Sequence, residues 1–432
     1  MNQNQMSFPI SYVDFIPQCL QAPAMFKQPE FEKFNILMQR ANQWLMQNPG
    51  FKSKTCESVE FLVDNFQNQG QYLTKTMFRE SGNIGSSFIR GLRLWFCSKD
   101  AGDASEPQQL GYLSVVPTCL SAAGMFSKPK FENFAQTVDR INEMFRQNPI
   151  PGRLLNVETQ DMTIKSWTGS VDADCSYFYK SADMGDSFVN VIRIFYVGGY
   201  PANEAIGCID FSPACIQPGG WLTIGAFEPM TSVAAKANAW MAANPGLPVI
   251  NLQSINYKMS ASWDGTGTLD TLRTFYTESG AGSTLYLRIL RVVFASTFDP
   301  SVMITRPGIS CLSYRTFSPC QTTTGGVYTP PEFETVSDTV KRILAWTQAT
   351  EAKVISAETV PILVQTGGLS QPWAIDPEAA YTFYRGGSDI AKYWRLVIRV
   401  YLDGTYQDPP SEVLPPAPLL QPTQEACCCS VM

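Results

Sequence analysis

The side chains of this 432-residue chain that could carry out chemistry are cysteines, carboxylates and arginines, because the sequence contains no histidine. That absence excludes Ser-His-Asp and Cys-His catalysis, zinc or haem held by histidine, and a histidine pH switch. Nine of the twelve cysteines precede residue 427, and they include no C-x₂₋₄-C pair of the kind that indicates a thiolate zinc site. We therefore expect neither a metal nor a cofactor.

An arginine recurs inside an apolar stretch about every 100 residues, at Arg93, Arg193, Arg291 and Arg399. It could anchor a carboxylate or phosphate ligand, or it could face outward or lie along a sheet edge because its neighbours face inward. It could also form a structural ion pair with a recurring glutamate. That glutamate recurs at Glu32, Glu132, Glu228 and Glu334. We favour the two structural interpretations.

A second set of acids, Glu57, Glu158 and Glu358, occupies similar places in the copies, with Gln253 in the third. Two such carboxylates could act as acid and base, as in a glycosidase, but a carboxylate in almost every copy favours an architectural role. Three cysteines recur in apolar segments and are expected to be small buried residues rather than nucleophiles. They are Cys19, Cys119 and Cys215. We expect no catalytic activity.

These residues recur because the chain contains four related segments. A Pro-x-Cys at residues 17–19, 117–119 and 213–215 is shortened to Pro319-Cys320 in the fourth segment, and each copy has a Phe-Glu pair. The copies span residues 8–98, 109–199, 204–297 and 308–403.

Each copy is predicted to form a strand, a helix and then three strands, which makes an α+β fold with an antiparallel sheet and one helix. In the first copy, apolar residues from Phe31 to Leu45 recur at spacings of three and four, as on one face of a helix. Glycine-rich links predict that the last two strands form a hairpin. Because one helix covers only one face of a sheet, neighbouring copies are expected to pair as two pseudo-dimeric lobes, copies 1–2 and 3–4.

The composition limits the partners and the compartment. The formal charge is −6 with no basic stripe, so nucleic acid is not an expected partner. The first residues lack the basic start and apolar stretch of a signal peptide, and no run reaches 18 apolar residues. These features favour a reduced, cytosolic body.

Residues 404–426 form a proline-rich segment without lysine or arginine. At about 3.1 Å per residue, an extended segment of this kind is a spacer that reaches on the order of 60–70 Å. It leads to residues 427–432, Cys-Cys-Cys-Ser-Val-Met.

This ending resembles the CaaX box of prenylated proteins, with Cys429, the aliphatic Val431 and Met432 in the positions of the motif. The resemblance implies farnesylation of Cys429 by prenyl-processing enzymes, followed by trimming and methylation. One lipid gives weak membrane binding, and no polybasic segment precedes the motif, so Cys427 and Cys428 are candidates for palmitoylation.

Three functions remain open from the sequence. The first is a lipid-anchored, non-catalytic scaffold or binding protein on the cytoplasmic face of a membrane, which associates with itself or with a protein partner. The second is a carrier of a small molecule or lipid in an apolar pocket between copies. The third is an enzyme that works without histidine.

Overall fold

The computed structural model describes residues 9–423 apart from short gaps. The gaps are residues 26, 64–73, 82–84, 101, 125–126, 165–169, 182–185, 221–222, 261–265, 279–282, 299–305, 307, 327–328, 367–372 and 385–390.

Copies 1 to 3 share one order of elements, and copy 4 follows the same order without the short strand pair that precedes the helix. Copy 1 contains β1 (Ser11–Phe15), β2 (Cys19–Gln21), β3 (Glu30–Phe31), α1 (Phe34–Gln47), β4 (Phe51–Leu62), β5 (Met77–Glu80) and β6 (Ser86–Ser98). Copy 2 contains β7 (Leu110–Val115), β8 (Cys119–Ser121), β9 (Lys130–Phe131), α2 (Phe134–Gln147), β10 (Gly152–Thr163), β11 (Tyr177–Lys180) and β12 (Ser187–Gly198). Copy 3 contains β13 (Glu204–Phe211), β14 (Cys215–Gln217), β15 (Ala226–Phe227), α3 (Met230–Ala243), β16 (Val249–Lys258), β17 (Phe275–Thr277) and β18 (Thr284–Thr297). Copy 4 contains β19 (Leu312–Phe317), α4 (Val336–Thr350), β20 (Val354–Thr366), β21 (Tyr381–Tyr384) and β22 (Lys392–Asp403). The repeat-like α+β organisation is thereby confirmed.

The last strand of each copy is the centre of an antiparallel sheet. β4 pairs with residues 88–98 of β6, which is almost the whole of that strand. β1 and β11 therefore share the other edge of β6, and they pair with successive parts of it. The same arrangement surrounds β12, β18 and β22.

The short strand that precedes each central strand pairs with the sheet of the preceding copy. β11 of copy 2 pairs with β6 of copy 1, β17 pairs with β12, and β21 pairs with β18. β5 of copy 1 pairs with β22 of copy 4. This last pairing closes a ring of four sheets, in which every contact between consecutive copies, here called a seam, includes an exchanged strand.

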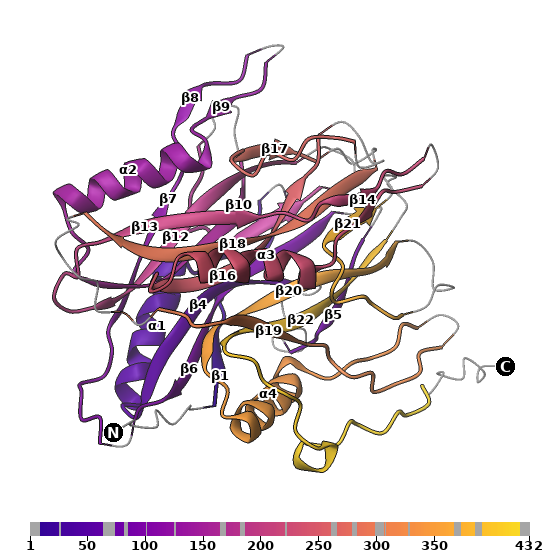
Figure 1. Ribbon diagram of the computed structural model, residues 1–432. Helices are drawn as coiled ribbons and strands as arrows, with labels where there is room; N and C mark the ends of the chain where they lie inside the picture. The colour runs from indigo at the N-terminus through magenta and orange to yellow at the C-terminus, as the bar shows by residue number, and fades with distance from the viewer. Residues whose placement is uncertain are drawn as a thin grey trace.

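Each helix lies on the outside of the ring and covers a seam (Figure 1). The apolar face of α1 packs on β4 and β6 of its own sheet and also on Leu110 and Phe195 of copy 2. α2 and α3 bridge to copies 3 and 4 in the same way, and α4 bridges to copy 1 through Ile10 and Trp95. The buried residues of α1 are those that the helical spacing predicts: Phe34, Leu37, Met38, Ala41 and Leu45.

Two predicted pairings are wrong. The last two strands of a copy do not form a hairpin, because the first of them pairs with the neighbouring sheet. The copies do not form two lobes, because an exchanged strand and a bridging helix occur at all four seams. Cys320 also lies one position away from its presumed equivalents, since Gln321 is the residue that bridges to Phe333 as Cys19 bridges to Phe31.

The proline-rich segment lies along copy 4 as far as residue 423, so its predicted extension away from the body is wrong over that length. Trp346 Nε1 donates to Asp408 (2.9 Å), and Leu414 packs against the core beneath α4. Near its end, Gln421 N donates to Thr322 O (2.8 Å) and Gln421 O accepts from Thr324 N (3.0 Å). Figure 1 shows this yellow segment passing α4.

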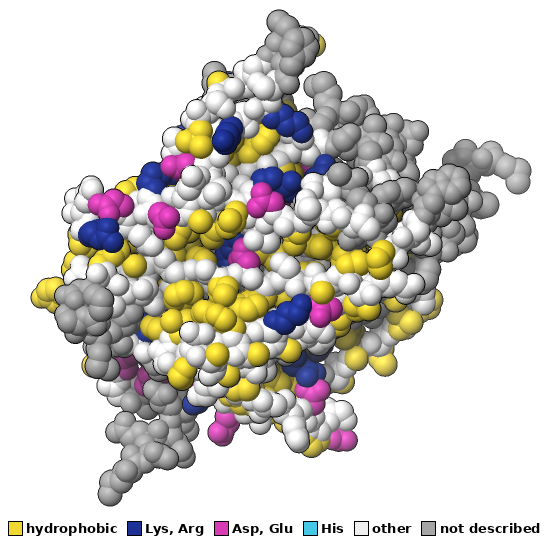
Figure 2. All heavy atoms as spheres, turned by 45° about the horizontal axis from the view of Figure 1, so that its top comes forward, with side chains coloured by type: hydrophobic (Ala, Val, Ile, Leu, Met, Phe, Trp, Pro, Cys, Tyr) yellow, Lys and Arg dark blue, Asp and Glu magenta, His cyan; other side chains and the backbone are white. Residues whose placement is uncertain are grey.

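The surface in Figure 2 carries basic and acidic side chains singly, among hydrophobic and uncharged ones. This agrees with a charged fraction of only 16%. The described part of this face therefore offers no concentration of one charge.

The exchange predicts that residues 1–200 do not fold as a monomer. In this fragment the sheet of β12 lacks β17 and β5 lacks its partner β22. The apolar face of α2 that packs on copy 3 is exposed. Size-exclusion chromatography and thermal melts should show an unfolded fragment or a dimer that rebuilds a four-copy ring, whereas the full chain melts cooperatively. A stable, cooperatively folded monomer of the fragment would support two lobes and contradict the ring.

Candidate functional site

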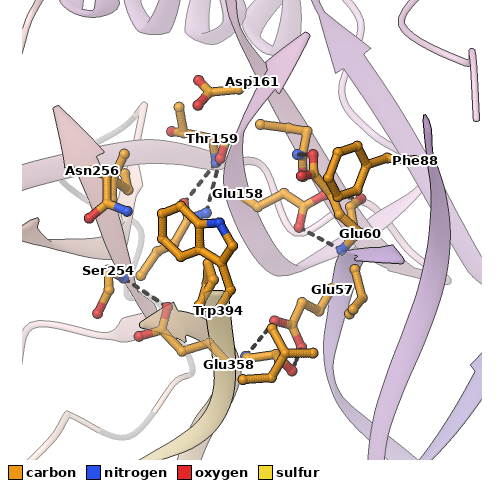
Figure 3. A pocket seen from close by; sticks show the side chains of 18 of the residues that line it. Glu57, Glu60, Phe88, Glu158, Thr159, Asp161, Ser254, Asn256, Glu358 and Trp394 are labelled. Atoms are coloured by element: carbon orange, nitrogen blue, oxygen red, sulfur yellow. Dashed lines mark hydrogen bonds between the residues drawn. The ribbon is translucent and has the colours of Figure 1, made fainter. Parts of the chain in front are cut away.

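The centre of the ring contains a cavity of about 350 Å³ that is lined by described residues of all four copies. Its walls are β4, β10, β16 and β20, whose inner residues face one another across the axis (Figure 3). Thr55, Asn156 and Asn251 line one end, here called the amide end. The opposite end is called the aromatic end, and it is lined by Phe88, Phe188, Tyr286 and Trp394.

The four recurring arginines are buried in the seams between copies and are not among the residues that line the cavity; each is at most 1% exposed. The prediction that they face outward is wrong. Alternation does place Arg93 on the face opposite Leu92 and Leu94, but those leucines pack under α1, and the other face packs on copy 4, where Arg93 meets Thr359 and Trp95 joins the core of α4.

The partners of these arginines alternate around the ring. Arg93 forms a bidentate ion pair with Asp14, with two bonds of 2.7 Å, and Arg291 pairs with Asp210 in the same way. Ser114 and Thr316 replace the aspartate in copies 2 and 4. There the nearest carboxylates belong to the second set of acids: Glu158 is 3.7 Å from Arg193 and Glu358 is 3.8 Å from Arg399.

Each arginine also donates to a hydroxyl of the preceding copy. Arg93 Nη1 donates to Thr359 Oγ1 (2.7 Å), which crosses from copy 1 to copy 4. The other three bonds run from Arg193 to Ser58 (2.5 Å), from Arg291 to Thr159 (2.8 Å) and from Arg399 to Ser254 (2.6 Å). One buried charge therefore links each pair of consecutive copies.

The second set of acids reinforces the same seams. The side chain at this position accepts a hydrogen bond from the backbone N–H of the hydroxyl residue in the preceding copy. These bonds join Glu57 to Thr359 (2.5 Å), Glu158 to Ser58 (3.0 Å), Gln253 to Thr159 (2.8 Å) and Glu358 to Ser254 (2.8 Å). This geometry supports the architectural interpretation of these carboxylates.

Two strand residues flank each recurring arginine, and in copy 1 both are carboxylates, whereas each of the other copies has one. Asp14 and Glu57 both flank Arg93, whereas Arg291 is flanked by Asp210 and the neutral Gln253. Burial raises the pKa of Glu57 to about 7, although Arg93 and the Thr359 N–H lower it. Glu57 is therefore largely protonated below neutral pH, when it becomes uncharged as Gln253 always is.

The amide end is closed by a third set of bonds between copies. Asn156 accepts from Cys56 N and donates to Cys56 O, both at 2.8 Å, and Asn251 makes the same pair of bonds with Val157. In copy 1 the equivalent residue is Thr55, whose buried Oγ1 has no hydrogen-bond partner within the described chain. The seam between copies 4 and 1 therefore lacks this link.

Acidic and basic groups gather toward the aromatic end. Glu60 accepts from Arg90 (2.8 Å), and Glu80 lies 3.5 Å from the Lys180 ammonium. Burial raises the pKa of Asp161 to about 6, although its bond from Tyr276 acts against this. Burial lowers the pKa of Lys180, but the neighbouring carboxylates, Glu80 first, raise it further than burial lowers it.

The glutamates that precede the helices lie outside the cavity and do not pair with the recurring arginines. Each accepts from a cation eight residues later in the helix, and this constant spacing is a signal in the sequence from which the pairs could have been predicted. The pairs are Glu32–Arg40, Glu132–Arg140, Glu228–Lys236 and Glu334–Arg342. These glutamates therefore do form structural ion pairs, but their partners are the cations of the helices and not the recurring arginines.

The cysteines of the described chain are all free thiols. Burial raises the pKa of Cys208 to about 12 and raises that of the cavity-lining Cys56 as well, which disfavours the thiolate. Cys19 and Cys119 are half-buried, but Cys215 is exposed, contrary to the prediction. Among the described residues no cluster of Cys, Asp or Glu could hold a metal ion. Cys427, Cys428 and Cys429 lie outside the described residues.

No family model, curated protein or solved structure matches this chain. No described helix is long and apolar enough to cross a membrane. A functional assignment therefore has to come from the cavity and its chemistry.

The additional carboxylate predicts that stability falls as the pH rises from about 4.5 through about 7. Over this range the folded chain keeps a proton on Glu57 that the unfolded chain has released, so the free energy of unfolding decreases by about 3 kcal/mol. Glu57→Gln should flatten denaturant-derived stability against pH. The readout is the slope, because glutamine loses the bond from Trp95. Gln253→Glu, the reciprocal change, should steepen it, and an unchanged slope in both variants would contradict the assignment.

The third set of bonds predicts a contrast between equivalent positions. Asn251→Ala leaves the buried N–H and C=O of Val157 unpaired and should lower the free energy of unfolding by about 2–4 kcal/mol. The matched change Thr55→Ala removes a hydroxyl without a partner and should cost less than about 1 kcal/mol. Equal losses in urea titrations would show that these bonds do not hold the seams.

Proposed function

We propose that this chain is a non-catalytic binding protein that is tethered to a membrane and holds a small ligand in the central cavity. The observation that carries this proposal is the cavity of about 350 Å³, to which all four copies contribute walls. Its volume lies at the lower end of the range of roughly 300–1,000 Å³ typical of ligand pockets.

The lining favours a polar ligand over a lipid tail. Between the two ends the walls carry carboxylates, amides and hydroxyls, including Gln160. Asn256 and Glu60 are two of these groups that Figure 3 labels. A carrier of apolar molecules would need an apolar wall along this length. The carrier hypothesis is therefore retained only for small polar compounds.

One observation favours the enzyme as a second candidate: Glu57 and Asp161 line the same cavity, and the pKa of each is raised. Both carboxylates are already engaged, however. Glu57 accepts from Thr359 and Trp95, and Asp161 accepts from Asn190 and Tyr276. Oxygens held in this way are suited to shaping a wall, and we propose that they take no part in catalysis.

The tether that we propose is the lipidated end, with a farnesyl group on Cys429 and palmitoyl groups on Cys427 and Cys428. Prenyl-processing enzymes and the cytoplasmic face of a membrane are then partners, in addition to the ligand and any self-association. The docked segment supports a short tether, since only three residues lie between Thr423 and Cys427, and the distance between these two residues is at most about 14 Å.

The docked segment also bears on which end of the cavity would face the membrane. Gln421 pairs with residues beside Phe333, whose ring lies 3.6 Å from the Arg395 guanidinium near the start of β22. That is the level of the aromatic end, since Trp394 is the adjacent residue. A lipid on Cys429 would hold this end of the cavity nearest the membrane.

Mass spectrometry of the full-length protein purified from eukaryotic membranes tests both parts of the proposal. The denatured protein should carry the mass of a farnesyl group and lack residues 430–432, and Cys429→Ser should leave the protein in the soluble fraction. The native mass should exceed the denatured mass by one small molecule. Gln160→Trp, which fills the cavity, should abolish that difference while the lipid is kept.

An unmodified terminus would contradict the tether. A native mass equal to the denatured mass, with no thermal stabilisation by any compound of a metabolite library, would contradict the binding function.

A further inference from the structure

The aromatic end of the cavity is built from equivalent positions of the four copies. Each position lies about five residues before the recurring arginine, at the start of the central strand, and all four line the cavity. The residues are Phe88, Phe188, Tyr286 and Trp394. An apolar contact alone would not require an aromatic ring in every copy.

The exchanged strands add a second aromatic layer. Phe178 pairs across the strands with Phe88, and their rings stack with centroids 5.2 Å apart. Tyr276 stacks on Phe188 at the same distance, and Phe78 is the strand partner of Trp394. Seven of the eight residues at these paired positions are thus aromatic, and Thr382, opposite Tyr286, is the eighth.

This aromatic end already holds positive groups against its rings. The Lys180 ammonium lies 5.0 Å from the centroid of Phe88, and the Arg90 guanidinium lies 4.8 Å from that of Phe178. Aromatic faces attract cations through the ring quadrupole, and the attraction increases when water is excluded.

The charged groups around the rings leave an excess of negative charge. The four cations here are Lys180, Lys392, Arg90 over Phe178 and Arg273 over Tyr276. The five carboxylates are Glu60, Glu80, Asp161, Asp186 and Glu278. Unpaired buried charge is unfavourable, so a positively charged ligand would be stabilised here.

At the aromatic end, the indole N–H of Trp394 lacks an acceptor within the described chain. Its Nε1 atom is buried. Figure 3 shows the Trp394 indole standing in the pocket. A bound molecule with an oxygen atom near its cation would supply the acceptor that this N–H lacks.

We propose that the aromatic end binds a small quaternary ammonium ion that carries an oxygen acceptor, such as choline. The methylated ammonium group lies against the aromatic rings and within the field of the surrounding carboxylates, and its oxygen accepts from Trp394. This inference rests on the proposed binding function and names its ligand class. The same head group could be free in solution or part of a phosphatidylcholine membrane.

The test compares choline with its neutral isostere 3,3-dimethyl-1-butanol, by calorimetric titration of the full-length protein. Choline should bind at least about tenfold more tightly than the isostere. Trp394→Leu and Phe88→Leu should each weaken choline binding at least about tenfold. Trp240→Leu, a matched change of a half-buried tryptophan on α3 outside the cavity, should leave it unchanged.

Flotation with vesicles separates the two sources of the head group, provided that the full chain carries Cys427→Ser, Cys428→Ser and Cys429→Ser so that no lipid anchors it. Binding to phosphatidylcholine vesicles but not to phosphatidylglycerol vesicles, lost in Trp394→Leu, supports the lipid head group even if free choline fails. Equal affinity for choline and the isostere, or failure of both choline and phosphatidylcholine, overturns the ligand class. If a compound of another class accounts for the native mass difference, the proposed binding function stands although the quaternary ammonium ligand is wrong.

Discussion

The hydrogen bond from each buried arginine to a hydroxyl of the preceding copy is the interaction on which the rest of the structure depends. A guanidinium removed from water costs several kcal/mol unless its donors are satisfied. Within its own copy, Arg291 finds Asp210 and Tyr257, but its remaining Nη1 is satisfied only by Thr159 of copy 2. Because the Nη1 of each of the four arginines donates to the preceding copy, no copy satisfies all the donors of its own buried arginine. The copies are therefore interdependent, and the exchanged strands and bridging helices complete a ring rather than four separate domains.

This way of closing the ring also leaves a cavity. Polar side chains that must meet partners in the neighbouring copy hold the four inner strands at fixed separations, so the centre does not collapse into an apolar core. Equivalent positions then form successive levels of amides, hydroxyls with carboxylates, and aromatic rings. Copy 1 departs from copy 3 at two equivalent positions. Glu57 replaces Gln253 and adds an acid to the seam between copies 4 and 1. Thr55 replaces Asn251 and removes a link from the same seam.

The sequence predicts those features that depend on local periodicity. The four copies, the amphipathic helices and the recurrence of Arg93 and its equivalents can all be recognised without a structure. Strand exchange could not be predicted, because β5 and β11 have only four residues each and pair equally well in a hairpin or with a neighbour. The orientation of Arg93 was derived correctly relative to Leu92, but alternation does not reveal that the opposite face is enclosed. The aromatic positions could have been found by aligning the copies on the arginines, whereas the cavity required the ring.

A double-mutant cycle between Arg291 and Thr159 tests the central claim most directly, because these residues are 132 positions apart and belong to different copies. The free energy of unfolding is measured for Arg291→Met, Thr159→Val and the double variant. The ring predicts a coupling free energy of at least about 1 kcal/mol, as found for residues that share a buried hydrogen bond. Additive effects, with a coupling indistinguishable from zero, would show that the arginine does not reach the preceding copy and would contradict the closed ring.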